Sequence, residues 1–482
     1  MKLRDLIPQQ DIVSVQGDAD TEVTEIVFDT EQVREGCCFV CLQGKQADGH
    51  AYADLAVSAG ATSVVTMQPY AHPYATVVQV RDTRCTLARM AANRYGNPAD
   101  KLRIFGVVGT NGKSTVAWLL QHILETAGRK TGLLGTICYR YGDVRQEAEL
   151  TTPDPLRLHA LLADMVASGV QDVVMEVSAH AIALRKMCGI RLECGIFTNF
   201  SQDHLDYFET MEAYRSCKIG YFRPENMNIA VCNADDDAGR ELWEHADVEQ
   251  KVSYGLDNPS DVFAVDVRQT DEGAHFVVNQ YDEIYEVRSN LYGRYNVSNM
   301  LAAAAAAGVC GISAETVCRA LNTAQPPSGR FNVIRSGGVK YVIDFAHTPD
   351  GLFQLLKEAR GLTRGKLITV FGCGGDRDVS KRPLMGKIAG ELSDVVIVTS
   401  DNPRTESRQA IAADIVSGIR LKGKLYVELD RPKAIELAAR LAQAGDTVLL
   451  AGKGCETYIE ENNTKIPYSD LAQVLRVVGR CV

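Results

Sequence analysis

The feature of this sequence that most constrains its fold is the alternation of short apolar runs with stretches of helical periodicity. The runs IFGVVG, LITVFG and DVVIVTS are each followed by a stretch whose apolar residues recur at helical spacing. Apolar strands that alternate with amphipathic helices are typical of parallel sheets with helices on both faces. We therefore expect an α/β protein built on doubly wound, mainly parallel sheets.

The chain is long enough for several such sheets. It has 482 residues, of which 46% are hydrophobic, and at about 100–200 residues per domain we expect three domains. The sequence texture changes after RYGNPAD and again at QPPSGRF, where proline and glycine mark a linker. We therefore predict a smaller N-terminal α/β domain (1–98), a central parallel-sheet domain (99–330) and a C-terminal Rossmann-like doubly wound domain (331–482).

Charge and hydropathy argue against two classes of partner. The net charge is -10 with a pI near 5.5, and no Lys/Arg-rich block occurs, which is unsuited to nucleic acid or anionic membranes. The N-terminus MKLRDLIPQQD lacks an apolar signal core, and runs such as LAAAAAAGV are too short to span a bilayer. We expect a cytoplasmic protein with no nucleic-acid partner and no membrane insertion.

Fourteen cysteines raise the questions of disulfides and of metal binding. The chain is too long and too rich in βα patterns to be a disulfide scaffold. Cys38 and Cys41 form a C-x-x-C within CCFVCL, but this run is strand-like and no second ligand pair stands nearby. We therefore favour a buried strand over a zinc site and expect reduced thiols.

A candidate phosphate-binding loop lies in GVVGTNGKSTVAWLL. The common pattern of glycine, four residues and Gly-Lys-Ser/Thr would place its first glycine at Val107, so the spacing is unusual. The parts are nevertheless present: an apolar strand, glycines, a lysine and a helix that begins at once. Backbone N–H groups at such a helix start point at an anion. We expect Lys113 to bridge the β- and γ-phosphates and Ser114 or Thr115 to ligate Mg²⁺, although a simple βα turn remains the alternative.

Charged side chains follow three apolar strands of the C-terminal region. Loops after the carboxyl ends of strands in a doubly wound sheet share one crevice. That crevice should gather side chains of both signs, which suits a zwitterionic amino acid; ordinary surface ion pairs are the alternative. The predicted set is Arg377, Asp401, Asn402, Arg404 and Glu456.

The form Gly109-Thr110-Asn111-Gly112-Lys113-Ser114-Thr115 resembles the Mur ligase family and the related folylpolyglutamate synthases. Nine further motifs occur in family order over nearly the whole chain: TTPDP, MEVSAHAIAL, FTNFSQDHLDYFETMEAY, YNVSNMLAA, SGRF, IDFAHTPDGL, GCGGDRDVSKRPLMG, DNPRTE and AGKGCETY. The resemblance implies three domains: one for a UDP-sugar, a central P-loop-type ATPase domain, and one for an amino acid. It also implies ATP and Mg²⁺ as cofactors.

Four residues carry the chemistry that the resemblance implies. Such an enzyme would phosphorylate the γ-carboxylate of the D-glutamate that ends a UDP-MurNAc-dipeptide, and an amine would then attack the acyl phosphate. Cations must neutralise the crowded negative charge. The resemblance assigns Lys113 to the phosphates, Glu176 and His204 to Mg²⁺, and Lys218 to a carbamate, formed with CO₂, that ligates a second Mg²⁺.

The resemblance also assigns the binding residues. ATP is expected to contact the phosphate loop (Gly109, Thr110, Asn111, Gly112, Lys113, Ser114 and Thr115), Asn299, Arg330 and Asp344. The UDP-MurNAc-dipeptide is expected to contact Thr30, Thr151, Thr152, Ser178 and Lys186. ATP would then lie between domains, and closure would assemble the site. Helix capping by Asn299 and surface solvation of Arg330 are the plainer alternatives.

The motif DNPR resembles that of ligases that add meso-diaminopimelate, with Arg377, Asp401, Asn402, Pro403, Arg404, Gly452 and Glu456 as the amino-acid site. The distal carboxylate of that diamino acid would pair with Arg404. L-Lysine lacks this carboxylate and would leave the arginine unpaired, which is costly when buried. We therefore expect a zwitterionic diamino acid, and a monomeric enzyme of peptidoglycan precursor synthesis.

Four departures from the family pattern bear on detail. Thr30, Ala179, Lys186 and Cys455 stand where the family usually has serine, serine, arginine and histidine. A lysine holds a carboxylate without the bidentate fork of arginine. Three alternatives stay open: the same scaffold with L-lysine or another amino acid, a folylpolyglutamate-type ligase, or a weakened nucleotide-binding sensor.

Overall fold

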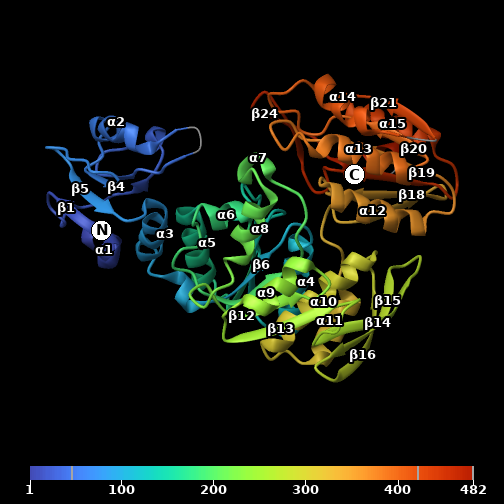
Figure 1. Cartoon of the computed structure of the whole chain (residues 1–482), viewed down its shortest axis with the longest axis horizontal. Helices are drawn as coiled ribbons and strands as arrows, with labels where there is room; N and C mark the ends of the chain where they lie inside the picture. The colour runs from blue at the N-terminus through green and yellow to red at the C-terminus, as the bar shows by residue number, and fades with distance from the viewer. Residues whose placement is uncertain (45–46, 421–422, 480–482) are drawn as a thin grey trace.

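The computed structural model describes residues 1–44, 47–420 and 423–479, and in it three successive sheets follow one another along the chain (Figure 1). A five-stranded sheet comes first, an eleven-stranded sheet second, and a six-stranded sheet third, followed by a two-stranded hairpin. This arrangement confirms the predicted multidomain α/β class. The domain boundaries at residues 98 and 330 stay predictions.

The first sheet is parallel except at one edge. Its strand order is β1-β5-β4-β3-β2, and only β1 pairs antiparallel with its neighbour. As expected, Cys38 and Cys41 are buried in and after a strand. The elements are α1 (Leu3–Leu6), β1 (Ile12–Gln16), β2 (Ile26–Val27), β3 (Cys38–Val40), α2 (Ala53–Ser58), β4 (Ser63–Thr66), β5 (Thr76–Val80) and α3 (Thr83–Arg94), with short 3₁₀ turns at Gln9–Asp11, Thr30–Gln32, Gly49–Tyr52 and Pro98–Lys101.

The second sheet is parallel at its centre and antiparallel at both edges. Strands β7-β10-β6-β11-β12-β13-β14 run parallel, and β8–β9 and β15–β16 extend the sheet antiparallel. The strands are β6 (Arg103–Val108), β7 (Thr131–Leu134), β8 (Tyr139–Tyr141), β9 (Val144–Gln146), β10 (Asp172–Glu176), β11 (Leu192–Phe197), β12 (Met227–Asn233), β13 (Gln250–Gly255), β14 (Val262–Gln269), β15 (Ala274–Gln280) and β16 (Glu283–Ser289). The helices are α4 (Lys113–Thr126), α5 (Pro155–Ala167), α6 (Ala179–Ala183), α7 (Leu205–Phe208), α8 (Met211–Ile219), α9 (Asp237–His245), α10 (Arg294–Val309) and α11 (Ala314–Thr323).

The antiparallel edge is a departure from the mainly parallel sheet that the sequence predicts. Strand β15 alternates buried and half-buried residues along its whole length. This period of two is typical of a sheet with one covered face, whereas central parallel strands are apolar on both faces. Ala274, Phe276 and Val278 form the covered face and belong to the same apolar cluster as α10.

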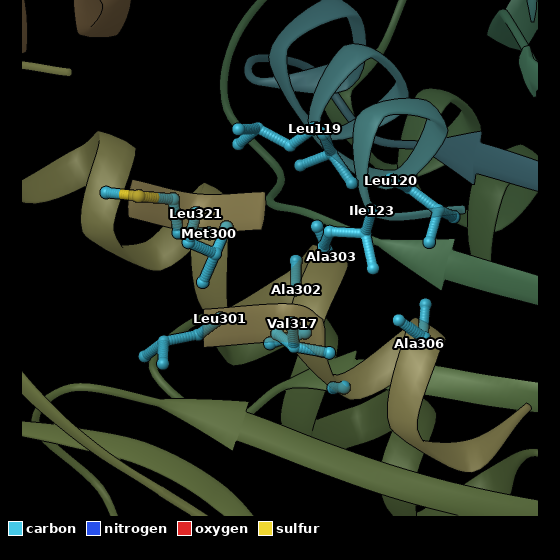
Figure 2. Close-up of a cluster of buried hydrophobic side chains, with 14 of the residues drawn as sticks. Leu119, Leu120, Ile123, Met300, Leu301, Ala302, Ala303, Ala306, Val317 and Leu321 are labelled. Carbon is cyan, nitrogen blue, oxygen red and sulfur yellow. The ribbon is translucent and has the colours of Figure 1, made fainter. Parts of the chain in front are cut away.

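Helices α4 and α10 pack closely in the core of the central domain (Figure 2). The run from Ala302 to Ala307 is fully buried, and Figure 2 shows the side chains of Ala303 and Ala306 lying near those of Ile123 and Leu120 on α4. Alanine has the smallest side chain with a Cβ, so it allows two helix backbones to approach. The close packing places residues of α10 beside the start of α4.

A disulfide between Cys85 and Cys188 corrects the expectation that all thiols are reduced. Cys85 lies on α3, and Cys188 lies in the loop between α6 and β11. The two residues are 103 positions apart, but their Cα atoms are 5.2 Å apart, within the range that a disulfide requires. A contact so distant in sequence leaves no local signal, and it connects the first and second domains covalently.

The third sheet is doubly wound, as predicted. Its order is β17-β18-β22-β19-β20-β21, with only β17 antiparallel. The strands are β17 (Asn332–Ser336), β18 (Val339–Asp344), β19 (Leu367–Phe371), β20 (Val395–Val398), β21 (Lys424–Val427), β22 (Thr447–Ala451) and the hairpin β23 (Tyr458–Glu461) and β24 (Thr464–Pro467); the helices are α12 (Pro349–Leu362), α13 (Lys381–Leu392), α14 (Arg408–Gly418), α15 (Arg431–Leu441) and α16 (Asp470–Val477). In the described parts of the chain, no helix has both the length and the apolarity to cross a bilayer.

A buried ion pair ties two strand ends of this sheet together. Arg431 donates two hydrogen bonds to the carboxylate of Asp470, at 2.8 and 2.7 Å, and both side chains are fully buried. The same guanidinium donates to the carbonyl oxygens of Ser400 (3.3 Å) and Ala451 (3.0 Å). It therefore fixes the segments that precede the candidate amino-acid loops.

Replacing Asp470 with alanine should destabilise the C-terminal domain by about 3–5 kcal/mol, because it leaves the buried Arg431 charge unpaired. Denaturant unfolding followed by circular dichroism measures the change. The solvent-accessible pair of Arg476 and Glu436, with side chains 60% and 38% exposed, joins the same two helices, α15 and α16. Glu436→Ala is therefore a matched control that should cost less than about 1 kcal/mol. Equal effects of the two substitutions would contradict the prediction.

Candidate active site

The phosphate loop lies at the carboxyl end of β6, a central strand of the second sheet. Helix α4 begins at Lys113, directly after Gly112. The loop backbone is fixed by the neighbouring strand end, since Asn199 accepts from Thr110 N through its carbonyl and from Asn111 N through its side chain, each at 2.9 Å. The N–H groups at the start of α4 are therefore held in the position that suits an anion.

Two glycines of the loop cannot carry a side chain. A Cβ on Gly109 would lie 1.8 Å from Thr198 Oγ1, and a Cβ on Gly112 would lie 2.4 Å from Asn299 Oδ1. Gly112 also has a φ of +85°, a conformation that favours glycine. The close approach at Gly112 results from the packing of α4 on α10 and brings Asn299 to the loop.

Lys113 lies over the loop from which it arises. Its Nζ donates to the carbonyl oxygens of Gly109 (3.0 Å) and Thr110 (2.9 Å). Burial lowers the pKa of Lys113, while the charge of Glu176 raises it in part. A phosphate oxygen in the loop would be a stronger acceptor than these carbonyl groups and would restore the cation.

Glu176, at the end of β10, faces the start of α4. Its carboxylate accepts from Ser114 Oγ (3.0 Å), from Thr136 N (2.8 Å) and from Thr136 Oγ1 (3.1 Å). A carboxylate and a hydroxyl are hard oxygen donors, and Mg²⁺ is usually held by one or two carboxylates with phosphates and water. Ser114 and Glu176 thus fit a Mg²⁺ ion that bound phosphates complete.

Lys218 of α8 reaches the same loop from the other side. Its Nζ donates to Thr110 Oγ1 at 2.8 Å and lies 4.0 Å from the centroid of the Tyr214 ring. The side chain is 1% exposed. Burial lowers the pKa of Lys218 well below its usual value, and the charge of Lys113 lowers it further. The neutral amine required for carbamate formation is therefore favoured.

His204 and Asp203 lie beside Lys113 and Lys218. Burial lowers the pKa of His204 to about 3, although the charge of Asp203 opposes the shift. Burial alone would raise the pKa of Asp203, but His204, His347 and Lys381 together hold it below its usual range. His204 is thus a neutral imidazole next to a carboxylate, the form in which histidine ligates metals.

Residues of the linker and the third sheet that are predicted to contact the nucleotide also lie beside the phosphate loop. Arg330 Nη2 donates to Ser114 Oγ at 2.9 Å, and its guanidinium lies 4.6 Å from the centroid of the Phe345 ring. The buried Nε of Arg330 has no acceptor among the described residues, so it keeps a donor for a ligand. Asp344 accepts from Phe331 N and Ala346 N, at 2.8 and 2.7 Å, and burial raises its pKa.

The plainer alternatives for two of these residues do not fit. Asn299 lies inside α10, is 7% exposed and donates to Asn296 Oδ1 at 3.0 Å, so it does not cap the helix. Arg330 is half-buried against Ser114 and Phe345 and is not a solvated surface residue. Both residues border the phosphate loop.

The segment expected to hold the muramoyl peptide forms the wall next to Glu176. Thr152 Oγ1 donates to the carbonyl of Glu176 (2.8 Å) and accepts from Ser178 N (3.0 Å). Thr151 Oγ1 lies 3.0 Å from Thr136 Oγ1. Lys186, which stands where the family has arginine, forms an ion pair of 2.7 Å with Asp154. Lys186 Nζ also donates to the carbonyl of Thr152 at 3.4 Å, so Thr152, Ser178 and Lys186 are linked around one strand end.

The crevice predicted at the carboxyl ends of the C-terminal strands is present. Asn402 is its central residue: its Oδ1 accepts from Lys453 Nζ (2.5 Å) and from Glu460 N (2.9 Å), and its Nδ2 donates to Glu456 Oε2 (3.0 Å). Burial alone would raise the pKa of Asp401, but Lys453 and Arg431 hold it low. Burial and the charge of Asp401 raise the pKa of Glu456.

A cavity of about 1010 Å³ joins the phosphate loop to this crevice. Gly109 and Lys218 do not line this cavity, but each contacts a residue that does. Pro403 lies within the DNPR loop and is also not part of the lining. Thr30 lies on the first domain, apart from the cavity. The predicted residues that line the cavity are Thr110, Asn111, Gly112, Lys113, Ser114, Thr115, Thr151, Thr152, Glu176, Ser178, Lys186, His204, Asn299, Arg330, Asp344, Arg377, Asp401, Asn402, Arg404, Gly452 and Glu456.

Several residues of the site are not singled out by the sequence. Asp203 forms an ion pair of 3.7 Å with Lys381. Asn111 Nδ2 donates to Asp350 Oδ2 at 3.0 Å. Both contacts connect the domain of the second sheet to that of the third. Thr136 orients Glu176 from the end of β7. Asp203 and Lys381 lie within quoted motifs and after strand ends, which is the signal that could have found them. Thr136 carries no such signal.

An enzyme that activates an acid with ATP needs its phosphate loop and its amine site to open on the same space, and here one cavity joins the phosphate loop to the C-terminal crevice. The protein is an ATP-dependent ligase of the type that joins an acid to an amino acid. Residues 107–307 match the model of the Mur ligase middle domain, and residues 329–454 match that of the Mur ligase glutamate ligase domain. The chain belongs to the Mur ligase family.

Individual relatives cover nearly the full chain. A UDP-N-acetylmuramoyl-L-alanyl-D-glutamate–2,6-diaminopimelate ligase of Clostridium acetobutylicum is 41% identical over 95% of both chains, and one of Aquifex aeolicus is 39% identical over 95% of this chain and 94% of its own. A solved structure of a ligase of the same name matches with a TM-score of 0.70 and 30% identity over 99% of both chains. A folylpolyglutamate synthase of Mycobacterium tuberculosis, 18% identical with a TM-score of 0.62 over 76% of this chain and 92% of its own, shares the fold alone.

Proposed function

We propose that this protein adds meso-diaminopimelate to the D-glutamate of UDP-MurNAc-L-Ala-D-Glu, with ATP and Mg²⁺, in peptidoglycan precursor synthesis. The observation that carries the proposal is the single cavity in which Lys113 and Glu176 meet the crevice of Asp401 and Arg404. The names of the full-length relatives support the same substrates. We further propose a monomer that acts in the cytoplasm.

The phosphate loop would bind and orient the triphosphate. Its backbone N–H groups and Lys113 supply positive charge where the terminal phosphate is transferred. Mg²⁺ would neutralise the remaining negative charge, held by Ser114 and Glu176, with His204 nearby. Asn299 would border the nucleotide from α10, and Arg330 and Asp344 would contact it from the linker and the third sheet.

A carbamate on Lys218 supports this arrangement on electrostatic grounds. The unmodified lysine lies buried near Lys113, so two ammonium groups would repel each other there. Reaction of the neutral Lys218 amine with CO₂ would release a proton and leave a carbamate anion in that position. The anion would balance Lys113 and offer oxygens to a second Mg²⁺.

The sites for the muramoyl dipeptide and for the amino acid would lie on either side of the phosphate loop. The muramoyl dipeptide would lie along Thr151, Thr152, Ser178 and Lys186, with its uridine end toward Thr30. The amino acid would lie along Arg377 and the DNPR and Gly452–Glu456 loops. The incoming amine would then meet the acyl phosphate between the second and third sheets, where closure of the cavity would exclude water.

The amino acid itself is tested by a panel. With ATP, Mg²⁺ and UDP-MurNAc-L-Ala-D-Glu, we expect amide formation with meso-diaminopimelate and a kcat/KM for L-lysine lower by about 30-fold or more. L-Lysine lacks the distal carboxylate that would accept charged hydrogen bonds from Arg404, which are worth on the order of 2–3 kcal/mol. Product mass and phosphate release measure the result. Equal use of the two amino acids would remove the role of Arg404. ATP binding without any amide product would favour the nucleotide-sensor alternative.

A further inference from the structure

The backbone of Arg404 is held in an unusual conformation by the β23–β24 hairpin. Its φ is +52°, in the left-handed region that residues with a side chain seldom adopt. Arg404 N donates to the carbonyl of Glu460 at 3.0 Å, and the carbonyl of Arg404 accepts from Asn462 N at 2.8 Å. The hairpin therefore fixes the direction in which the Arg404 side chain leaves the DNPR loop.

The guanidinium of Arg404 is oriented by the same hairpin. Its Nε donates to Glu460 Oε2 at 3.1 Å, and its Nη1 donates to the carbonyl of Gly375 at 2.7 Å. No described residue accepts from Nη2, and Arg404 lines the cavity. Two of its three nitrogens are thus held, and the third keeps its donors for a ligand.

Glu460 also orients the other central residue of the crevice. Its backbone N–H donates to Asn402 Oδ1 at 2.9 Å, next to the donor Lys453 Nζ. Through its N–H, its carbonyl and its carboxylate, one residue therefore contacts both Asn402 and Arg404. It does so from a strand that lies more than 50 positions further along the chain.

We infer that Glu460 is a positioning residue that determines the preference of the amino-acid site for a substrate with a distal carboxylate. The inference rests on the proposed function and deepens it. The Glu460 carboxylate keeps the Arg404 guanidinium turned so that its free edge meets that carboxylate. Without it, the long arginine side chain samples other rotamers, and binding must restore the order that the hairpin now supplies.

The pair has little to contribute to stability. The side chains of Arg404 and Glu460 are 20% and 27% exposed, so solvent screens their attraction, and ion pairs of this kind are weak. Loss of the Glu460 carboxylate should therefore alter substrate binding without unfolding the domain.

The adjacent residue provides a matched control. Glu461 lies on the same strand and forms its own ion pair, with Arg408 Nε at 2.8 Å and Nη2 at 2.6 Å. The two side chains are 30% and 31% exposed. Arg408 begins α14, outside the crevice, and the pairing of Glu461 with Arg404 is through the backbone only. Glu461→Ala thus removes a similar charge from a similar place without touching Arg404 or Asn402 side chains.

The experiment compares Glu460→Ala, Glu460→Gln and Glu461→Ala with the wild type in steady-state assays with meso-diaminopimelate and with L-lysine. For Glu460→Ala we expect the KM for meso-diaminopimelate to rise about 10-fold or more, as for loss of a charged hydrogen bond, with kcat within about threefold. The KM values for ATP and UDP-MurNAc-dipeptide should not change. The preference for meso-diaminopimelate over L-lysine should fall by a similar factor.

Glu460→Gln keeps an acceptor for Arg404 Nε and should recover part of the lost affinity, which a purely structural role would not explain. Thermal unfolding verifies that each variant is folded; if the alanine variant is not, the glutamine variant should still show a KM raised by about threefold or more. Unchanged KM and preference in the folded Glu460 variants, or an equal loss in Glu461→Ala, would overturn the inference. A wild type that forms no amide with meso-diaminopimelate would instead overturn the proposed function.

Discussion

Replacing Lys113 with methionine is expected to reduce ATP-dependent phosphate release by about a thousandfold or more. Positive groups that stabilise a transferring phosphoryl group are commonly worth factors of this size. Lys113 lies over the phosphate loop, where it donates hydrogen bonds to the carbonyl oxygens of Gly109 and Thr110. Methionine keeps the length and the apolar stem but removes the charge and the donors.

The assay measures phosphate release with saturating ATP, UDP-MurNAc-L-Ala-D-Glu and meso-diaminopimelate. Lys130, an exposed lysine shortly after the end of α4, supplies the control Lys130→Met, which should retain full activity. Circular dichroism should show that the Lys113→Met protein is folded. A folded variant that keeps more than a tenth of wild-type turnover would contradict the role given to this lysine.

The second large effect is expected at Lys218. Lys218→Ala should lower turnover by about a thousandfold, since it removes the carbamate proposed to ligate the second Mg²⁺. Formate or acetate should recover part of the loss by occupying the vacated volume. Neither ion should stimulate the wild type. The half-buried Arg215 lies on the same helix and pairs with Glu241, away from the phosphate loop, so Arg215→Ala is a control that should leave turnover unchanged.

A readout independent of turnover separates carbamate chemistry from a simple need for lysine. Wild-type protein in ¹³C-labelled bicarbonate should show a carbamate carbon resonance, and Lys218→Ala should lack it. Full activity of the alanine variant would rule out a required carbamate. A loss without rescue and without a wild-type resonance would show that the amine itself acts.

The phosphate loop could be found from sequence because its signal is local. Strand, glycines, lysine and helix occupy one continuous stretch from Gly106 to Leu120, and each part has a direct physical reason. The C-terminal crevice could also be found, since the strand-end rule gathers residues such as Arg377, Asn402 and Glu456 without any knowledge of their contacts. Both predictions depend on topology, which the alternation of strands and helices encodes strongly.

Contacts between distant segments could not be predicted in the same way. Thr136 holds Glu176 from the end of β7, but a threonine after a strand is too common to carry information. The disulfide of Cys85 and Cys188 joins two unremarkable helical and loop positions. Glu460 lies in a hairpin more than 50 positions beyond Arg404, which it contacts only through the tertiary fold. Each of these depends on three-dimensional packing and not on a local pattern.

The alanine run of α10 has a consequence for how this enzyme tolerates change. From Ala302 to Ala307 every side chain is already at the smallest size that still favours a helix, and all six are fully enclosed. Larger residues at the positions that face α4 would push the two helices apart, because the packed core has no room for added methyl groups. Substitutions in this segment, which carries no reactive group, would thus affect the phosphate loop at the start of α4.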